Sequence, residues 1–132
     1  MLRGNIRIEA TKSTPETDLN PDGFIRFAGR SVFSENNEFR ARVKTWVNEY
    51  LCNPAEVTCI DFRFEYLPTS NTKFYFNMLR RVATVSLKNK QYRINWYYDE
   101  GDEDILEKGE YISSILNIPF NFIRVSDQKK PE

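Results

Sequence analysis

The alternation of apolar and polar positions along the chain predicts five β-strands and indicates which face of each strand is buried. Within the stretch from 57 to 66, Phe62 is apolar whereas its neighbours Asp61 and Arg63 are charged. This period of two is typical of a strand with one buried face. Similar patterns predict the other strands at residues 6–10, 24–28, 92–98 and 120–125. Residues 11–22 are rich in turn-forming residues and predict a loop, so we expect the first two strands to form a hairpin with a long connection.

Apolar positions that recur every three to four residues predict three helices. The first begins with Ser34 as its N-cap and ends at Asn53-Pro54, because a proline disfavours helical backbone in the residue before it. The second is expected from about Asn71 to Val85 and the third from about Asp102 to Leu116. The predicted order is therefore ββαβαβαβ.

This order predicts an α/β fold with a mixed sheet of four to five strands, because strands that alternate with helices pair mostly in parallel. Two strands carry polar residues along one side, so we expect the helices mainly on one face of the sheet. Residues 1–125 are expected to form a single domain, and residues 126–132 a polar tail.

Composition supports a folded domain and offers little for catalysis. The 132 residues are 40% hydrophobic and 14% aromatic, which is enough to build a core. Lys+Arg and Asp+Glu both number 19, so no overall charge favours nucleic acid or an anionic membrane. The sequence contains neither an apolar run of the ~20 residues that a membrane helix needs nor a visible signal peptide. We therefore expect a cytoplasmic location.

The absence of histidine removes the usual catalytic arrangements. Neither a Ser-His-Asp triad nor a Cys-His pair can be built, and Cys52 and Cys59 do not have the spacing of a zinc site. None of the 5 glycines forms a phosphate-binding loop. We expect no enzymatic activity, no cofactor and no metal. The enzyme alternative is hydrolysis by the carboxylates Asp99, Asp102 or Glu103, although no pair with opposed environments is evident from the sequence.

The strongest candidate for a functional site is the turn between the strand 57–66 and the second helix. A phosphate on Thr69 would meet unpaired N–H groups and the positive end of the helix dipole. The alternative is that Thr69, Ser70 or Asn71 only caps the helix. The turn comprises a run of residues from the strand end to the first helical turn: Tyr66, Leu67, Pro68, Thr69, Ser70, Asn71, Thr72 and Lys73.

Two further segments carry candidate functional features. The acidic run from 99 to 110 lacks glycine at the sixth position of a calcium loop, so it reads as the start of a helix or as a patch that faces a partner. In the preceding aromatic triplet, alternation predicts that Trp96 and Tyr98 are buried and Tyr97 lies at the surface. Acidic neighbours disfavour stacking on nucleic acid.

Several of these motifs together resemble the SiaC-type regulatory phosphoproteins, over roughly residues 12–124. The most specific match is the stretch Trp96-Tyr97-Tyr98-Asp99-Glu100 with the acids that follow it, up to Pro119-Phe120. Weaker matches occur in the same order upstream, at Ser13-Thr14-Pro15-Glu16, Gly29-Arg30-Ser31, Trp46 and Tyr66-Leu67-Pro68-Thr69-Ser70. The turn departs from the family pattern at Pro68, where the family has Asn, and at Asn71, where it has a second Ser.

The resemblance implies a STAS-like fold, similar to that of anti-sigma-factor antagonists, and a role in partner switching. In such a system a serine/threonine kinase phosphorylates a threonine of the turn, and a PP2C-type phosphatase removes the phosphate. The unphosphorylated protein binds and modulates a diguanylate cyclase. By position, the implied phosphoacceptor is Thr69. The implied partner-binding residues are Tyr66, Pro68, Thr69, Ser70, Asn71 and Lys73. An anti-sigma-factor antagonist with a different partner is the alternative.

Overall fold

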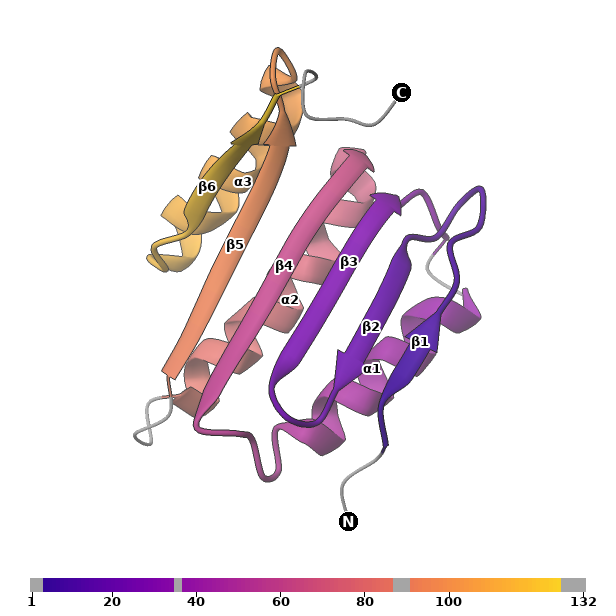
Figure 1. The fold of residues 1–132 in the computed structure, drawn as a ribbon, viewed down its shortest axis with the longest axis vertical. Helices are drawn as coiled ribbons and strands as arrows, with labels where there is room; N and C mark the ends of the chain where they lie inside the picture. The colour runs from indigo at the N-terminus through magenta and orange to yellow at the C-terminus, as the bar shows by residue number, and fades with distance from the viewer. Residues whose placement is uncertain (1–3, 35–36, 87–90, 127–132) are drawn as a thin grey trace.

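The computed structural model describes residues 4–34, 37–86 and 91–126 (Figure 1). The elements follow one another as β1 (Ile6–Ile8), β2 (Glu16–Asn20), β3 (Phe24–Arg30), α1 (Glu38–Tyr50), β4 (Val57–Tyr66), α2 (Thr69–Ser86), β5 (Gln91–Asp99), α3 (Glu103–Leu116) and β6 (Asn121–Val125). Of the predicted polar tail, residues 126–132, only residue 126 lies within the described part.

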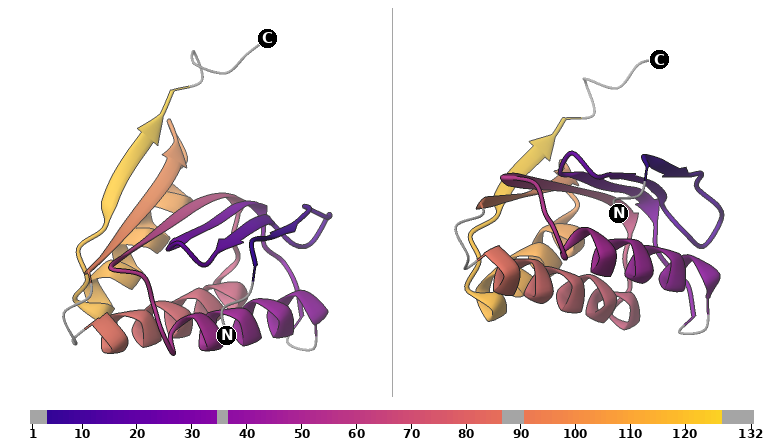
Figure 2. Two further views of the ribbon diagram at one scale, coloured as in Figure 1. Left: turned by 60° about the horizontal axis from the view of Figure 1, so that its bottom comes forward. Right: turned by 90° about the horizontal axis from the view of Figure 1, so that it is seen from below.

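A single sheet of six strands runs through the described residues in the order β1-β2-β3-β4-β5-β6. The β1–β2 and β2–β3 pairs are antiparallel, and the β3–β4, β4–β5 and β5–β6 pairs are parallel. Each parallel pair is joined through a helix, and α1, α2 and α3 all cover the same face (Figure 2). The prediction of a mixed α/β fold with its helices on one face is confirmed.

The predicted strand number and the order ββαβαβαβ are wrong, because β2 lies where the sequence predicted a loop. Thr17 and Leu19 point into the core and are 0% and 1% exposed, whereas Asp18 lies on the open face. The buried Thr17 hydroxyl donates to the Pro15 carbonyl at 3.1 Å, so its polarity costs little. Threonine, aspartate and asparagine are turn formers, which concealed this strand.

The predicted hairpin between residues 6–10 and 24–28 is also wrong, because β2 lies between these two strands. β2 pairs with β1 on one side and with β3 on the other. A tight turn leads from β2 into β3, and in it the Gly23 N–H donates to the Asn20 carbonyl at 2.9 Å. Gly23 has φ +110°, and an added Cβ would lie 2.3 Å from the Val57 carbonyl oxygen, so this turn depends on glycine.

The helix ends differ from the predicted ones by a few residues. α1 is capped by Asn37, whose Oδ1 accepts from the Phe39 N–H at 2.6 Å, and not by the predicted Ser34. α2 begins at Thr69 rather than at about Asn71. The predicted start of α3 is confirmed, since the Asp102 carboxylate accepts from the Ile105 N–H at 3.1 Å.

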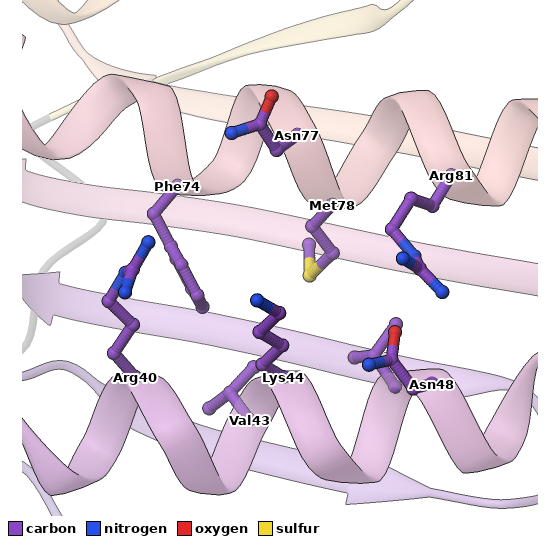
Figure 3. A pocket seen from close by; sticks show the side chains of 9 residues that line it. Arg40, Val43, Lys44, Asn48, Phe74, Asn77, Met78 and Arg81 are labelled. Atoms are coloured by element: carbon purple, nitrogen blue, oxygen red, sulfur yellow. The ribbon is translucent and has the colours of Figure 1, made fainter.

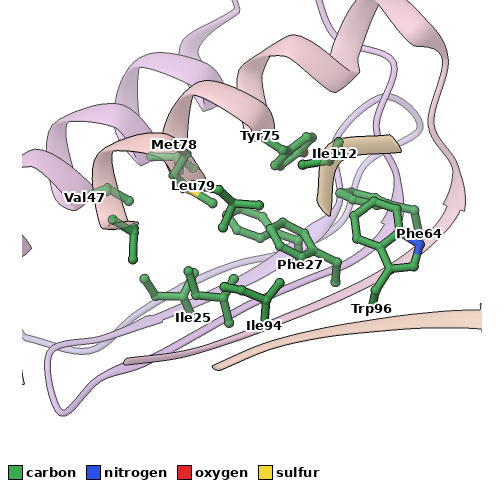
Figure 4. Packing of buried hydrophobic residues seen from close by; sticks show 14 of the residues in the cluster. Ile25, Phe27, Val47, Phe64, Tyr75, Met78, Leu79, Ile94, Trp96 and Ile112 are labelled. Carbon is green, nitrogen blue, oxygen red and sulfur yellow. The ribbon is translucent and has the colours of Figure 1, made fainter. Parts of the chain in front are cut away.

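An aromatic core lies between the sheet and the helices (Figure 4). Phe27 and Phe62 stack with ring centroids 5.6 Å apart, and Tyr75 of α2 meets both rings edge-on. Trp96 is fully buried, as predicted, and its indole N–H donates to the Ile105 carbonyl at 2.9 Å. Tyr98 is partly buried against the same cluster. Because rings from both layers interlock, the start of α2 is held rigidly against the sheet.

Candidate functional site

The candidate turn connects the carboxyl end of β4 to the amino end of α2 through Leu67 and Pro68. Leu67 is 0% exposed and anchors the turn in the core. The Pro68 carbonyl accepts from the Asn71 N–H at 2.9 Å and from the Thr72 hydroxyl at 3.3 Å. These bonds close the first turn of the helix and leave the Thr69 side chain exposed.

Asn71 lies beneath the turn and connects it to the segment between β3 and α1. Its Nδ2 donates to the Phe33 carbonyl, and its Oδ1 accepts from the Phe33 N–H, each at 3.0 Å. The same Oδ1 accepts from the Ser31 hydroxyl at 3.1 Å. Asn71 is 5% exposed, so its side chain is occupied inside the protein. The Asn71 side chain therefore does not cap α2, which excludes one of the alternatives predicted for the turn.

A buried chain of hydroxyls extends this network into the core. Because the Ser31 hydrogen goes to Asn71, the Tyr75 hydroxyl donates to Ser31 Oγ, at 2.8 Å. Burial raises the pKa of Tyr75 far above its ordinary value, so this hydroxyl keeps its proton and remains a donor. The floor of the turn is thus a fixed polar network inside an otherwise apolar core.

The outer surface of the turn carries hydroxyls and cations. Thr69, Ser70 and Lys73 are exposed, and Lys73 follows Thr69 by four positions on α2, so their side chains are neighbours on the helix surface. On the other side, the Arg30 guanidinium lies 5.1 Å from the centre of the Tyr66 ring, which is 45% exposed. The turn therefore combines an exposed hydroxyl with a lysine one helical turn away and an arginine that covers the Tyr66 ring at the strand end.

Next to the turn, α1 and α2 enclose a groove that the sequence analysis missed (Figure 3). A hollow of about 70 Å³ has Val43, Val47, Phe74 and Met78 at its base. A second hollow of about 110 Å³ includes Phe74 and reaches Ser70 at the turn. Arg40 and Lys44 fall off the apolar stripe of the first predicted helix, which predicts a solvated face. The structure places them beside Arg81 of α2 instead. The sequence did not predict this, because a one-dimensional pattern does not show that two helices present cations to each other.

Two of the three carboxylates named in the hydrolysis alternative make structural contacts. Asp102 is used as the cap of α3, and Asp99 lies 4.0 Å from Arg63. Within residues 4–34, 37–86 and 91–126, no three His, Cys, Asp or Glu side chains come together in a way that could hold a metal ion. Of the helices in these ranges, none has the length and apolarity needed to cross a membrane.

The described residues thus form a one-sided α/β sheet with an exposed threonine at a strand-to-helix turn. The model of the SiaC family regulatory phosphoproteins matches residues 8–125, and the chain belongs to this family. The resemblance predicted from the sequence is thereby confirmed.

Solved structures share the fold at low sequence identity. Apo-SiaC from Pseudomonas aeruginosa superposes with a TM-score of 0.77 at 23% identity, over 92% of this chain and 98% of that one. SiaC from the same organism, in complex with the diguanylate cyclase SiaD of which it is the activator, gives 0.78 at 24% identity, over 92% and 98%. A third structure of this SiaC gives 0.75 at 22%, over 94% and 99%. No curated protein matches the chain.

Proposed function

We propose that this protein binds a diguanylate cyclase and modulates its activity, and that a phosphate on Thr69 controls the binding. The family consists of regulatory phosphoproteins, and the P. aeruginosa SiaC that shares this fold activates the cyclase SiaD. The observation that carries the proposal is the position of Thr69, which is exposed on a rigid turn at the carboxyl end of a central strand.

The local chemistry suits a reversible phosphate at this position. The first turn of α2 has no acidic residue, so the helix dipole and the leading N–H groups would favour an anion. Lys73 lies one turn along the helix, within reach of a phosphate on Thr69. The modification would add about −1.5 to −2 charges at pH 7, which is enough to change how a partner fits against the turn.

We infer that the protein acts by binding rather than by catalysis, in the cytoplasm and without a cofactor. A serine/threonine kinase and a PP2C-type phosphatase would set its phosphorylation state. The proposed docking surface is the turn itself, formed by Tyr66, Pro68, Thr69, Ser70 and Lys73. Asn71 would contribute from below, by holding the turn in shape.

The test is phosphorylation of the purified chain by serine/threonine kinases from its own genome, with mass spectrometry to locate the phosphate. We expect one phosphate on Thr69, lost in Thr69→Ala and retained in Ser70→Ala, which removes the neighbouring exposed hydroxyl. Phosphate that remains in Thr69→Ala and is lost in Ser70→Ala would place the modified residue at Ser70. If no kinase phosphorylated the chain, the proposed switch would be refuted.

The partner is tested with the cyclases of the same organism. The unphosphorylated chain should bind one of them and change its rate of cyclic-di-GMP synthesis, and phosphorylation should reverse the effect. The STAS-like character inferred from the resemblance makes an anti-sigma factor the alternative partner. Binding to an anti-sigma factor and to no cyclase would favour that alternative.

A further inference from the structure

The groove between α1 and α2 has an apolar base that reaches the protein surface. β3, β4 and β5 are parallel and are joined through these helices, so α1 and α2 run side by side in the same direction (Figure 3). Val43, Val47 and Met78 are at most 6% exposed and form its base, while Phe74 is partly exposed at one end. A hollow of about 70 Å³ is several times what one water molecule needs, and it suits an inserted apolar side chain.

The charged residues that the structure describes at the rim of this groove are all basic. Arg40 and Lys44 project from α1 and Arg81 projects from α2, whereas none of the described residues that line the groove is acidic. The Arg40 guanidinium lies 5.9 Å from the centre of the Phe74 ring, so it also covers the apolar end of the groove. Cations on both sides of an apolar base are complementary to a ligand with apolar residues along its centre and carboxylates along its edges.

The groove continues to the proposed phosphorylation site. Arg40 and Phe74 line both the hollow at the base of the groove and the hollow beside the turn. The hollow beside the turn is also lined by Ser70 and Lys73. Thr69 immediately precedes Ser70 and lies one helical turn from Lys73. A phosphate on Thr69 would therefore put negative charge at the end of a cationic groove.

We propose that the α1–α2 groove receives an acidic amphipathic helix of a partner protein, and that a phosphate on Thr69 weakens this binding by charge repulsion and by engaging Lys73. The second half rests on the proposed function of Thr69. Helix backbones offer no free hydrogen-bonding edge, so recognition here is by side chains, as in other helix-in-groove complexes. A nucleic acid would be drawn to the cations but would make no use of the buried apolar base.

The binding half is tested without any cellular partner, using two labelled helical peptides. One has leucines along one face flanked by glutamates, and its twin has lysines in place of the glutamates. The acidic peptide should bind the full chain, as measured by fluorescence anisotropy, and the basic twin should not. The Lys44→Glu, Arg81→Glu double variant should weaken binding at least about tenfold. Arg42→Glu, an exposed reversal elsewhere on α1, should leave it unchanged.

The position of the bound peptide is determined independently by NMR, from the methionine methyl signals. The chain has 2 methionines, Met1 and Met78, so the Met78 signal is the one that is absent from the spectrum of Met78→Leu. In the natural protein this signal should shift when the acidic peptide binds. The proposal is overturned if that signal does not move, if the double variant binds as tightly as Arg42→Glu, or if a single-stranded oligonucleotide shifts Met78 and displaces the peptide.

The regulatory half is tested with Thr69→Glu against its neutral match Thr69→Gln. The glutamate variant should bind the acidic peptide several-fold more weakly than the glutamine variant, and the difference should shrink at high salt. Equal affinities would overturn the coupling and leave the groove assignment standing. These peptide-binding experiments need neither a kinase nor a cyclase. A failure of the proposed function at Thr69 would be seen separately, as a chain that is not phosphorylated or that binds no cyclase.

Discussion

The Asn71 side chain and the Phe33 backbone, 38 residues apart in the chain, exchange two hydrogen bonds of 3.0 Å. This pairing resembles a step of a β-ladder, with an amide side chain in place of one strand. It holds the first turn of α2, which begins with Thr69, against the segment that leads into α1. The shape of the candidate switch therefore depends on a residue that no partner needs to touch.

Replacing Asn71 by alanine should destabilise the protein strongly. The substitution leaves the Phe33 N–H and carbonyl without their partner in a buried place, and each such loss costs about 1–3 kcal/mol. We expect the free energy of unfolding, measured by urea denaturation, to fall by about 2–4 kcal/mol. Asn71→Asp should also be destabilising, since it removes the Nδ2 donor and buries a charge.

The control for this prediction is Ser70→Ala, at the exposed neighbouring position. A surface change of this kind should alter the free energy of unfolding by no more than about 0.5 kcal/mol. If Asn71→Ala cost no more than Ser70→Ala, the hydrogen bonds to Phe33 would not hold the turn.

Gly109→Ala should destabilise the protein, although alanine normally strengthens a helix by about 1 kcal/mol relative to glycine. A Cβ at Gly109 would lie 2.5 Å from the Trp96 Nε1 atom, whose N–H bonds to the Ile105 carbonyl. Because Trp96 is fully buried, the indole cannot move aside freely, and we expect a loss of about 1–3 kcal/mol. Tryptophan fluorescence during denaturation measures it. Ser114→Ala, at an exposed position of the same helix, should be neutral or slightly stabilising, and equal effects of the two changes would contradict the clash.

The hydrophobic pattern of the sequence predicted the strands with apolar buried positions, but not the contacts between distant segments. Alternation identified β4 and β5 because their buried positions are aromatic or aliphatic, and it failed for β2 because Thr17 is a buried hydroxyl among turn formers. The turn at Thr69 was singled out from its place between a strand and a helix, and its role as phosphoacceptor, which the family resemblance implies, stays a prediction. The bonds of Asn71 to Phe33 were not predictable, because they join segments far apart in the chain. The groove was missed for the same reason, since its two rims come from different helices.

Acid should weaken the open face of the sheet through Glu16. Its pKa is lowered, first by the hydrogen bond from Arg26 at 2.9 Å and further by Arg7. A carboxyl group whose pKa is depressed in the folded state adds stability above its unfolded pKa, near 4.3, and this stability is lost as the pH falls through the folded value. The contribution is below about 1 kcal/mol, because the Glu16 side chain is 31% exposed.

The measurement compares the free energy of unfolding of the natural protein and Glu16→Gln from pH 7 down to pH 3. The gap between the two should be largest near neutral pH and should close on acidification. Glu110→Gln, at an exposed position of α3, should follow the natural protein throughout. A gap for Glu16→Gln that is independent of pH would assign its effect to packing instead of charge.

Pro68→Ala should increase the rate at which a kinase phosphorylates Thr69. The Pro68 carbonyl makes the bonds that close the first turn of α2, and alanine retains that carbonyl. Proline fixes φ near −65°, and its removal gives the opened chain more freedom, worth about 0.4–1 kcal/mol. A kinase that needs the turn opened would then act roughly two- to fivefold faster, since 1.4 kcal/mol corresponds to tenfold. The measurement is kcat/KM for phosphorylation.

The matched control for this prediction is Pro21→Ala, in the turn between β2 and β3, which changes chain entropy in a similar way but far from the switch. If both variants lost stability and neither was phosphorylated faster, the kinase would recognise the turn as it stands in the folded protein. If Pro68→Ala alone was faster, local opening would limit the reaction, and Pro68 would act as a brake on the switch. Phosphorylation slowed by Pro68→Ala would show that the kinase reads the proline itself.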